Sequence, residues 1–125
     1  MRDTMIKIAF PTESELGLKD SLSQHFGHCP SFTIVSWDSD SKSVKNVEVF
    51  QNQGHEEGGC MSPVMALKNN GVNAIIVGGI GMRPLMGFRQ VGITPFAGVE
   101  GTVELNLKAY TENKLEELTE ASCQH

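Results

Sequence analysis

Two histidines and a cysteine lie within five positions of one another in this 125-residue chain. They are His25, His28 and Cys29, and a run typical of a β-strand follows them at residues 31–35. Imidazole nitrogen and thiolate sulfur are donors that zinc, copper and iron–sulfur species accept in proteins. The segment therefore either holds a metal species or only turns the chain before the next strand.

A second segment, residues 52–60, brings another imidazole and another thiol, His55 and Cys60, on a glycine-rich backbone. Cys60 lies at the start of an expected helix, where the helix dipole and free N–H groups favour the thiolate that binds metal. The spacing matches no closed zinc module, so it predicts an open or accessory site. The expected metal ligands are His25, Cys29, His55 and Cys60, with His28 as a further cofactor contact.

Each of these residues also has an ordinary structural interpretation. His25 could hydrogen-bond the turn that contains it, and His28 could be a solvated loop residue. Free cysteines are often small buried hydrophobic residues, which would suit Cys29 and Cys60 equally well. Trp37 and Tyr110 are most simply packing residues.

A third candidate is the glycine-rich segment at residues 78–81, where Gly79 is expected to contact a cofactor. Glycines before a helix can form a phosphate-binding turn, but neither G-x-G-x-x-G nor G-x-x-x-x-G-K-[ST] occurs in the chain. The competing interpretation is a tight turn that needs positive φ. A nucleotide site is therefore poorly supported, and so is hydrolysis, because no G-x-S-x-G elbow is present.

Length and composition indicate one α/β domain over residues 1–125, with a core of about residues 5–118 and a frayed tail at 119–125. The net charge of −5 argues against nucleic acid as a partner. No apolar run approaches the roughly 20 residues of a membrane span, and no export signal is recognisable. We expect a cytoplasmic protein whose three cysteines stay reduced.

The elements that must position these side chains follow from hydrophobic patterning. Strands are expected at residues 5–10, 32–37, 44–50, 73–77 and 94–97, and helices at 61–70, 83–91 and 102–113. This β-β-β-α-β-α-β-α order predicts a mixed five-stranded sheet, with the strand at 94–97 at its edge because of Pro95. If the first strand is central, the segments after strands one, three and four meet at one end of the sheet, where ligands bind in open α/β folds.

Several motifs together resemble the dinitrogenase iron–molybdenum cofactor biosynthesis family. They are the residues at 6–12, the Ser-Gln-His-Phe-Gly element at 23–27, the Asn52…His55…Gly58-Gly59 segment, the glycine-rich turn at 77–81 with Gly92-Ile93, and residues 100–103. The resemblance runs from about Met5 to Leu118, nearly the whole chain.

The resemblance implies a ribonuclease H-like fold and a non-catalytic protein that binds or carries an iron–sulfur or iron–molybdenum cluster or its precursor. It also implies cluster donor or acceptor proteins as partners. His25 and His55 match histidines of the family's motifs, whereas a ligand role for Cys29 and Cys60 depends on their chemistry alone. Two other functions stay open: a thiol-dependent enzyme that uses Cys60, and a protein–protein adaptor without bound metal.

Overall fold

The computed structural model describes residues 5–24, 30–51 and 61–118, which form a mixed six-stranded sheet with three α-helices. The strands are β1 (Met5–Thr12), β2 (Ser31–Asp38), β3 (Ser43–Gln51), β4 (Ala74–Val77), β5 (Thr94–Ala97) and β6 (Glu116–Glu117). The helices are α1 (Met61–Asn69), α2 (Met82–Val91) and α3 (Val103–Thr111), with a short 3₁₀ helix, η1 (Gly17–Lys19). None of the helices in these ranges has the length and apolar character that a membrane crossing requires.

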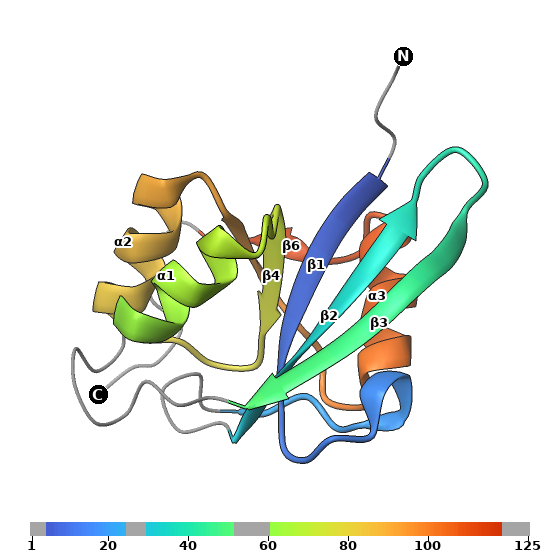
Figure 1. The fold of residues 1–125 in the computed structure, drawn as a ribbon, viewed down its shortest axis with the longest axis horizontal. Helices are drawn as coiled ribbons and strands as arrows, with labels where there is room; N and C mark the ends of the chain where they lie inside the picture. Colours follow the sequence, from blue (N-terminus) through green and yellow to red (C-terminus); the bar gives the residue numbers. More distant parts are fainter. Residues whose placement is uncertain (1–4, 25–29, 52–60, 119–125) are drawn as a thin grey trace.

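The first strand lies at the centre of the sheet, which is the condition on which the expected meeting of the strand ends depends. The strand order is β3-β2-β1-β4-β5-β6; β1 pairs antiparallel with β2 and parallel with β4. The meander of β1, β2 and β3 therefore builds one half, and the βαβ crossovers through α1 and α2 build the other (Figure 1). A short turn at residues 39–42 joins β2 to β3, whereas the longer segment at 13–30, which contains η1, joins β1 to β2. The parallel neighbours are joined through helices, as parallel pairing requires.

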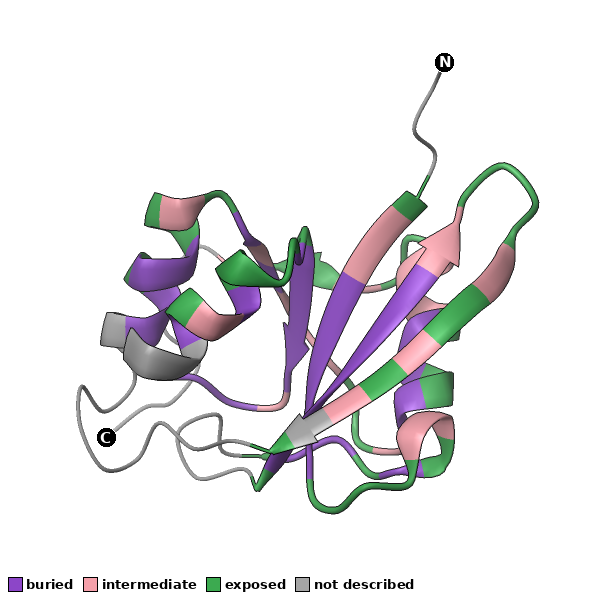
Figure 2. Cartoon of the chain, in the orientation of Figure 1, coloured by how far each residue is buried: buried purple, intermediate pink, exposed green. Residues whose placement is uncertain are grey.

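Helices cover both faces of the sheet, so that the central strands are buried on two sides (Figure 2). Successive side chains of a strand point to opposite faces. Ala9 accordingly packs with residues of α1 and α2, whereas its neighbours Ile8 and Phe10 pack with Val103 and Leu107 of α3. In β4, Ile75 and Val77 face the first of these clusters and Ile76 the second. This arrangement explains the uninterrupted apolar run at residues 74–77, which is typical of a doubly covered strand.

Glycines end two of the helices, and a threonine begins the third. Gly92 adopts the left-handed conformation (φ 85°) after α2, and Gly71 does so (φ 76°) after α1. The Thr102 side chain accepts a hydrogen bond from the Leu105 N–H and so caps the start of α3. These residues stop the helices where the next strand must begin.

The expected five strands were wrong, because a sixth strand, β6, pairs antiparallel with β5. The Leu118 N–H donates to the Pro95 carbonyl (2.9 Å), and Leu118 packs against the core. The strand that contains Pro95 is therefore not at the edge of the sheet. Its Pro95 carbonyl still accepts a hydrogen bond, although proline has no N–H to donate.

The first strand also runs two residues further than expected, through Pro11 to Thr12. Its parallel register with β4 involves Ile8 and Ala9, so Pro11 lies beyond that pairing. The Pro11 carbonyl accepts from the Ser23 N–H (2.8 Å), which connects the strand end to the segment that precedes His25.

Candidate functional site

Four strands end at the same end of the sheet, which we call the carboxyl end and which is marked by Thr12, Gln51, Val77 and Ala97. The register places Ser31, the first residue of β2, opposite both Thr12 and Gln51. The expected convergence of strand ends is therefore confirmed.

The expected ligands themselves, His25, His28, Cys29, His55 and Cys60, lie outside the described residues. The described residues that flank them in the chain lie at the carboxyl end of the sheet: Gln24 and Ser31 on either side of residues 25–29, and Gln51 before residues 52–60 (Figure 1). Whether these imidazoles and thiols meet one another stays a prediction. Of the expected site residues, only Gly79 belongs to the described part of the chain, and it is buried directly after β4.

The segment at residues 20–24, which leads to His25 and which we call the entry segment, is held on two sides. Its Leu22 N–H donates to the Gly101 carbonyl (2.9 Å), and its Asp20 carbonyl accepts from the Val103 N–H (2.9 Å). Single bridges pair Thr12 with Leu22 and Ser21 with Thr102. The end of β1 and the start of α3 therefore fix the position of this segment.

The buried Asp20 carboxylate shapes the turn between β1 and the entry segment. It accepts hydrogen bonds from the Ser14 N–H (3.1 Å), the Ser14 hydroxyl (3.0 Å), the Leu16 N–H (3.2 Å) and the Ser21 N–H (2.8 Å). A carboxylate that is only 2% exposed needs such donors, because desolvation without them is costly. Sequence reasoning missed this role, although an aspartate among serines is a known turn signal.

A cluster of hydroxyl groups holds the start of β2 immediately after residues 25–29. The Thr12 hydroxyl lies 2.8 Å from the Ser31 hydroxyl and 3.1 Å from the Thr33 hydroxyl, and all three residues are buried. The Ser31 hydroxyl also donates to the Ser14 carbonyl. Nothing in the alternation of the strands points to these three hydroxyls, because a serine or threonine on a buried face looks like a small core residue.

Gly78 lets the glycine-rich segment pass directly against the entry segment. A Cβ atom on Gly78 would lie 2.7 Å from the Ser23 carbonyl oxygen and 3.1 Å from the Gln24 Cα. Real Cβ atoms essentially never come within 3.0 Å of such an atom, and a contact of 3.1 Å is tighter than nine in ten. The positive-φ glycines among the described residues are Gly17, Gly71, Gly92 and Gly101, so the suggestion that the turn at residues 78–81 needs positive φ was wrong.

A second close approach holds the far side of the entry segment. A Cβ atom on Gly98 would lie 2.6 Å from Leu22 Cδ2 and 2.8 Å from Asn106 Oδ1. The fully buried Asn106 side chain accepts from the Val99 N–H (2.7 Å) and donates to the carbonyls of Val99 and Thr102 (2.9 Å each). One amide therefore fixes the loop between β5 and α3 against which the entry segment packs.

The described residues alone do not provide a metal site: among them, no three histidine, cysteine, aspartate or glutamate side chains converge in a way that could hold an ion. The histidines and cysteines of the chain all lie outside the described residues, at 25–29, 52–60 and 119–125. The described part of the chain supplies the end of the sheet from which the segments at 25–29 and 52–60 lead.

Comparisons with known proteins agree with this arrangement. A model of the dinitrogenase iron-molybdenum cofactor family matches residues 5–113. An uncharacterized protein of Methanocaldococcus jannaschii, MJ0580, is 32% identical over 114 residues, which cover 90% of this chain and 91% of that protein.

Two solved structures share the fold over almost their whole length. The NMR structure of TM1290, a proposed NifB protein from Thermotoga, has a TM-score of 0.76 at 26% identity and covers 96% of this chain and 99% of its own. The crystal structure of MJ0327, a proposed dinitrogenase of Methanocaldococcus jannaschii, has a TM-score of 0.72 at 25% identity and covers 95% of this chain and 99% of its own.

Proposed function

Because this chain belongs to the dinitrogenase iron-molybdenum cofactor family, we propose that it binds and carries an iron–sulfur or iron–molybdenum type cluster, or a precursor of one. The cluster is cargo in this proposal, and the protein does not catalyse a reaction. Cluster donor and acceptor proteins are its partners.

The proposed ligands are His25, Cys29, His55 and Cys60, with contacts from His28 and the Gly79 backbone. The observation that carries the proposal is the rigid carboxyl end of the sheet, where hydrogen bonds and the contact with Gly78 hold the entry segment just before His25. A carrier must release its load, so ligands on segments that span such an end suit it better than a closed tetrahedral site. Protonation of His25 or His55 below about pH 6.5 should weaken the binding of this cargo, because imidazole must be neutral to act as a ligand.

The strand order also supports the ribonuclease H-like assignment that accompanies this proposal. Three strands form an antiparallel meander, and two parallel strands extend the sheet beyond the first strand, giving the order β3-β2-β1-β4-β5. In such sheets the loops at the strand ends carry the binding residues, which agrees with the proposed ligand positions.

Anaerobic reconstitution with iron and sulfide tests the proposal. The wild-type protein should emerge from desalting with sulfide-to-iron charge-transfer absorption, and the double variant His25→Ala/Cys60→Ala should lose it. The matched control is Cys123→Ala/His125→Ala, which removes the same two residue types from positions with no proposed role and should keep the absorption. Absence of bound iron from the wild-type protein, or equal retention by both double variants, would refute the proposed ligands.

A further inference from the structure

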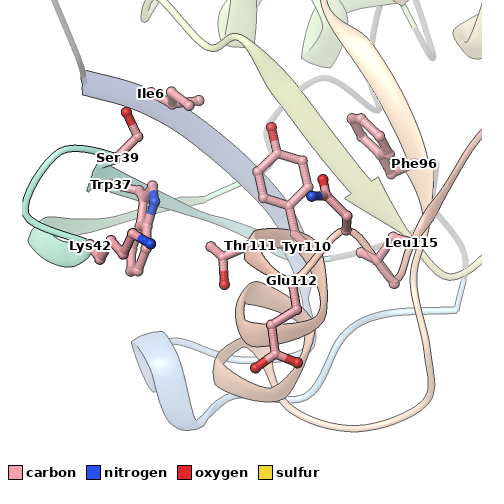
Figure 3. Close-up of a pocket in the computed structure, with 10 residues that line it drawn as sticks. Ile6, Trp37, Ser39, Lys42, Phe96, Tyr110, Thr111, Glu112 and Leu115 are labelled. Atoms are coloured by element: carbon pink, nitrogen blue, oxygen red, sulfur yellow. The ribbon is translucent and has the colours of Figure 1, made fainter.

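A cavity of about 540 Å³ lies between the sheet and the last turn of α3. Ile6 at the start of β1, Trp37 near the end of β2 and Lys42 in the turn before β3 form part of its wall. Phe96 of β5, the last turn of α3 and the residues after that turn form the rest of the wall, with Ser39 beside Lys42 (Figure 3). Ligand sites of small molecules span roughly 300–1,000 Å³, so the cavity has the size of such a site.

Three aromatic rings from three different elements line the cavity. Trp37 of β2 lies directly opposite Ile6 of β1 in the sheet register. Phe96 of β5 and Tyr110 of α3 form an edge-to-face pair with ring centroids 5.1 Å apart and an angle of 81° between the planes. Rings held on strands and a helix offer rigid, flat surfaces, which favour a planar aromatic guest.

The ammonium group of Lys42 offers the cavity a partner for an anion. Glu112 forms an ion pair with Lys114 (3.1 Å), and Figure 3 shows its carboxylate pointing away from Trp37 and Tyr110. Lys42 lines the cavity, and no carboxylate within the described residues forms an ion pair with it. The cavity thus presents an ammonium group that forms no ion pair among the described residues, although the chain as a whole carries a net charge of −5.

The hydroxyl of Tyr110 adds a polar group among the rings. Within the described part of the chain it has no hydrogen-bond partner, and burial raises the pKa of Tyr110 above its ordinary value of 10.0. The phenol is therefore neutral at pH 7 and can donate a hydrogen bond to a bound molecule.

We propose that this cavity binds a small planar aromatic anion, with the ring against Trp37 and Tyr110 and the anionic group at the Lys42 ammonium. This site is independent of the cluster proposed for the carboxyl end. The same chemistry is offered by aromatic carboxylates and by nucleoside monophosphates, so both belong in the test.

The chain carries one tryptophan, and this residue lines the cavity, so its indole N–H reports binding directly. Two-dimensional ¹H–¹⁵N NMR of the full-length apo protein should show a saturable shift of that signal with 2-naphthoate or with AMP as probe. Three further probes separate the contributions of ring and charge: neutral 2-naphthylmethanol, non-aromatic cyclohexanecarboxylate and cationic 2-naphthylmethylammonium. The proposal expects 2-naphthoate and AMP to bind more tightly than these three probes.

Variants locate the anionic group. Lys42 has φ 55°, a conformation that asparagine tolerates, so Lys42→Asn removes the charge without straining the turn. The substitution should weaken the affinity for 2-naphthoate about two- to fivefold, the range expected for an exposed ion pair. It should leave the affinity for 2-naphthylmethanol unchanged. Lys45→Gln, on the exposed face of the adjoining strand β3, is the matched control and should bind like the wild type.

Tyr110→Phe removes the hydroxyl and keeps the ring that packs against Phe96. It should weaken the binding of both 2-naphthoate and AMP. The proposal is overturned if no probe shifts the indole signal up to about 10 mM. It is also overturned if the cationic probe binds more tightly than naphthoate, or if Lys42→Asn and Lys45→Gln bind naphthoate equally.

Discussion

Replacing Gly78 by serine should unseat the entry segment from the carboxyl end of the sheet. The new Cβ would meet the Ser23 carbonyl oxygen at 2.7 Å and the Gln24 Cα at 3.1 Å. Neither contact is with the end of a flexible side chain, and the entry segment is itself held by the hydrogen bonds of Leu22 and Ser23 (2.9 and 2.8 Å). The strain therefore cannot be relieved by a change of rotamer.

Overpacking of this kind costs about 1–3 kcal/mol of unfolding free energy. For a domain of this size, 1 kcal/mol corresponds to roughly 4 °C, so the melting temperature should fall by about 4–12 °C. Circular dichroism during thermal and urea unfolding measures both quantities. The change should also lower cluster retention in the anaerobic reconstitution, because the residues just before His25 are displaced.

Gly81→Ser is the matched control for this prediction. It introduces the same side chain three residues further along, where the nearest atom to a new Cβ is Pro84 Cδ at 4.0 Å. Gly81 also precedes α2 as its N-cap, with φ −82°, a position that serine favours. The control should melt at the wild-type temperature or above it. Equal losses of stability in the two variants would show that the contact between Gly78 and the entry segment is not what requires glycine.

Three further predictions follow from single contacts. Asn106→Leu should destabilise the protein by about 2–4 kcal/mol, because the Val99 N–H and two carbonyls lose their partner inside the core; urea unfolding checks this. Leu118→Ala should cost about 1–2 kcal/mol by removing a partly buried contact that anchors β6, with exposed Leu105→Ala as a weaker control in the same assay. Because the folded pKa of Tyr110 is raised, stability should be intact below pH 10 and fall as the pH rises through the folded pKa; ultraviolet titration of this single tyrosine should show a midpoint above 10.0.

The central sheet could be predicted from the sequence because its signals are local. Alternation in β1 and β2, the apolar run of β4 and the glycines after α1 and α2 each act within a few residues. The sixth strand could not, since Glu116 and Glu117 are poor strand formers. They pair with β5 because Leu118 packs on the core and its N–H reaches the Pro95 carbonyl, and both contacts join residues distant in sequence.

The supports of the candidate site were harder to predict than its expected ligands. Histidine and cysteine stand out by type, whereas Asp20 and Asn106 act through backbone partners that only the folded chain brings near. Gly78 belongs to the glycine-rich turn that the sequence indicates. A glycine is needed there because Ser23 and Gln24, more than fifty residues away in the chain, pack against its backbone. Similarly, Trp37 and Tyr110 were expected only to pack, and the cavity between them depends on where α3 ends.

The helix α3 takes part in both ends of the molecule. At its start, the Val103 N–H and the bridge from Thr102 hold the entry segment; near its end, Tyr110 and Thr111 line the aromatic cavity. Val103 and Tyr110 are seven residues apart, which at 1.5 Å for each residue separates the two roles by about 10.5 Å. Movement of α3 can couple the cavity to the carboxyl end if the helix has two placements and the cavity ligand binds one of them more tightly. The cavity ligand and the cluster would then change each other's affinity by the same factor. The hydrogen bonds of Asn106 oppose such a movement, because the loop before α3 and the helix itself are joined by that one buried side chain.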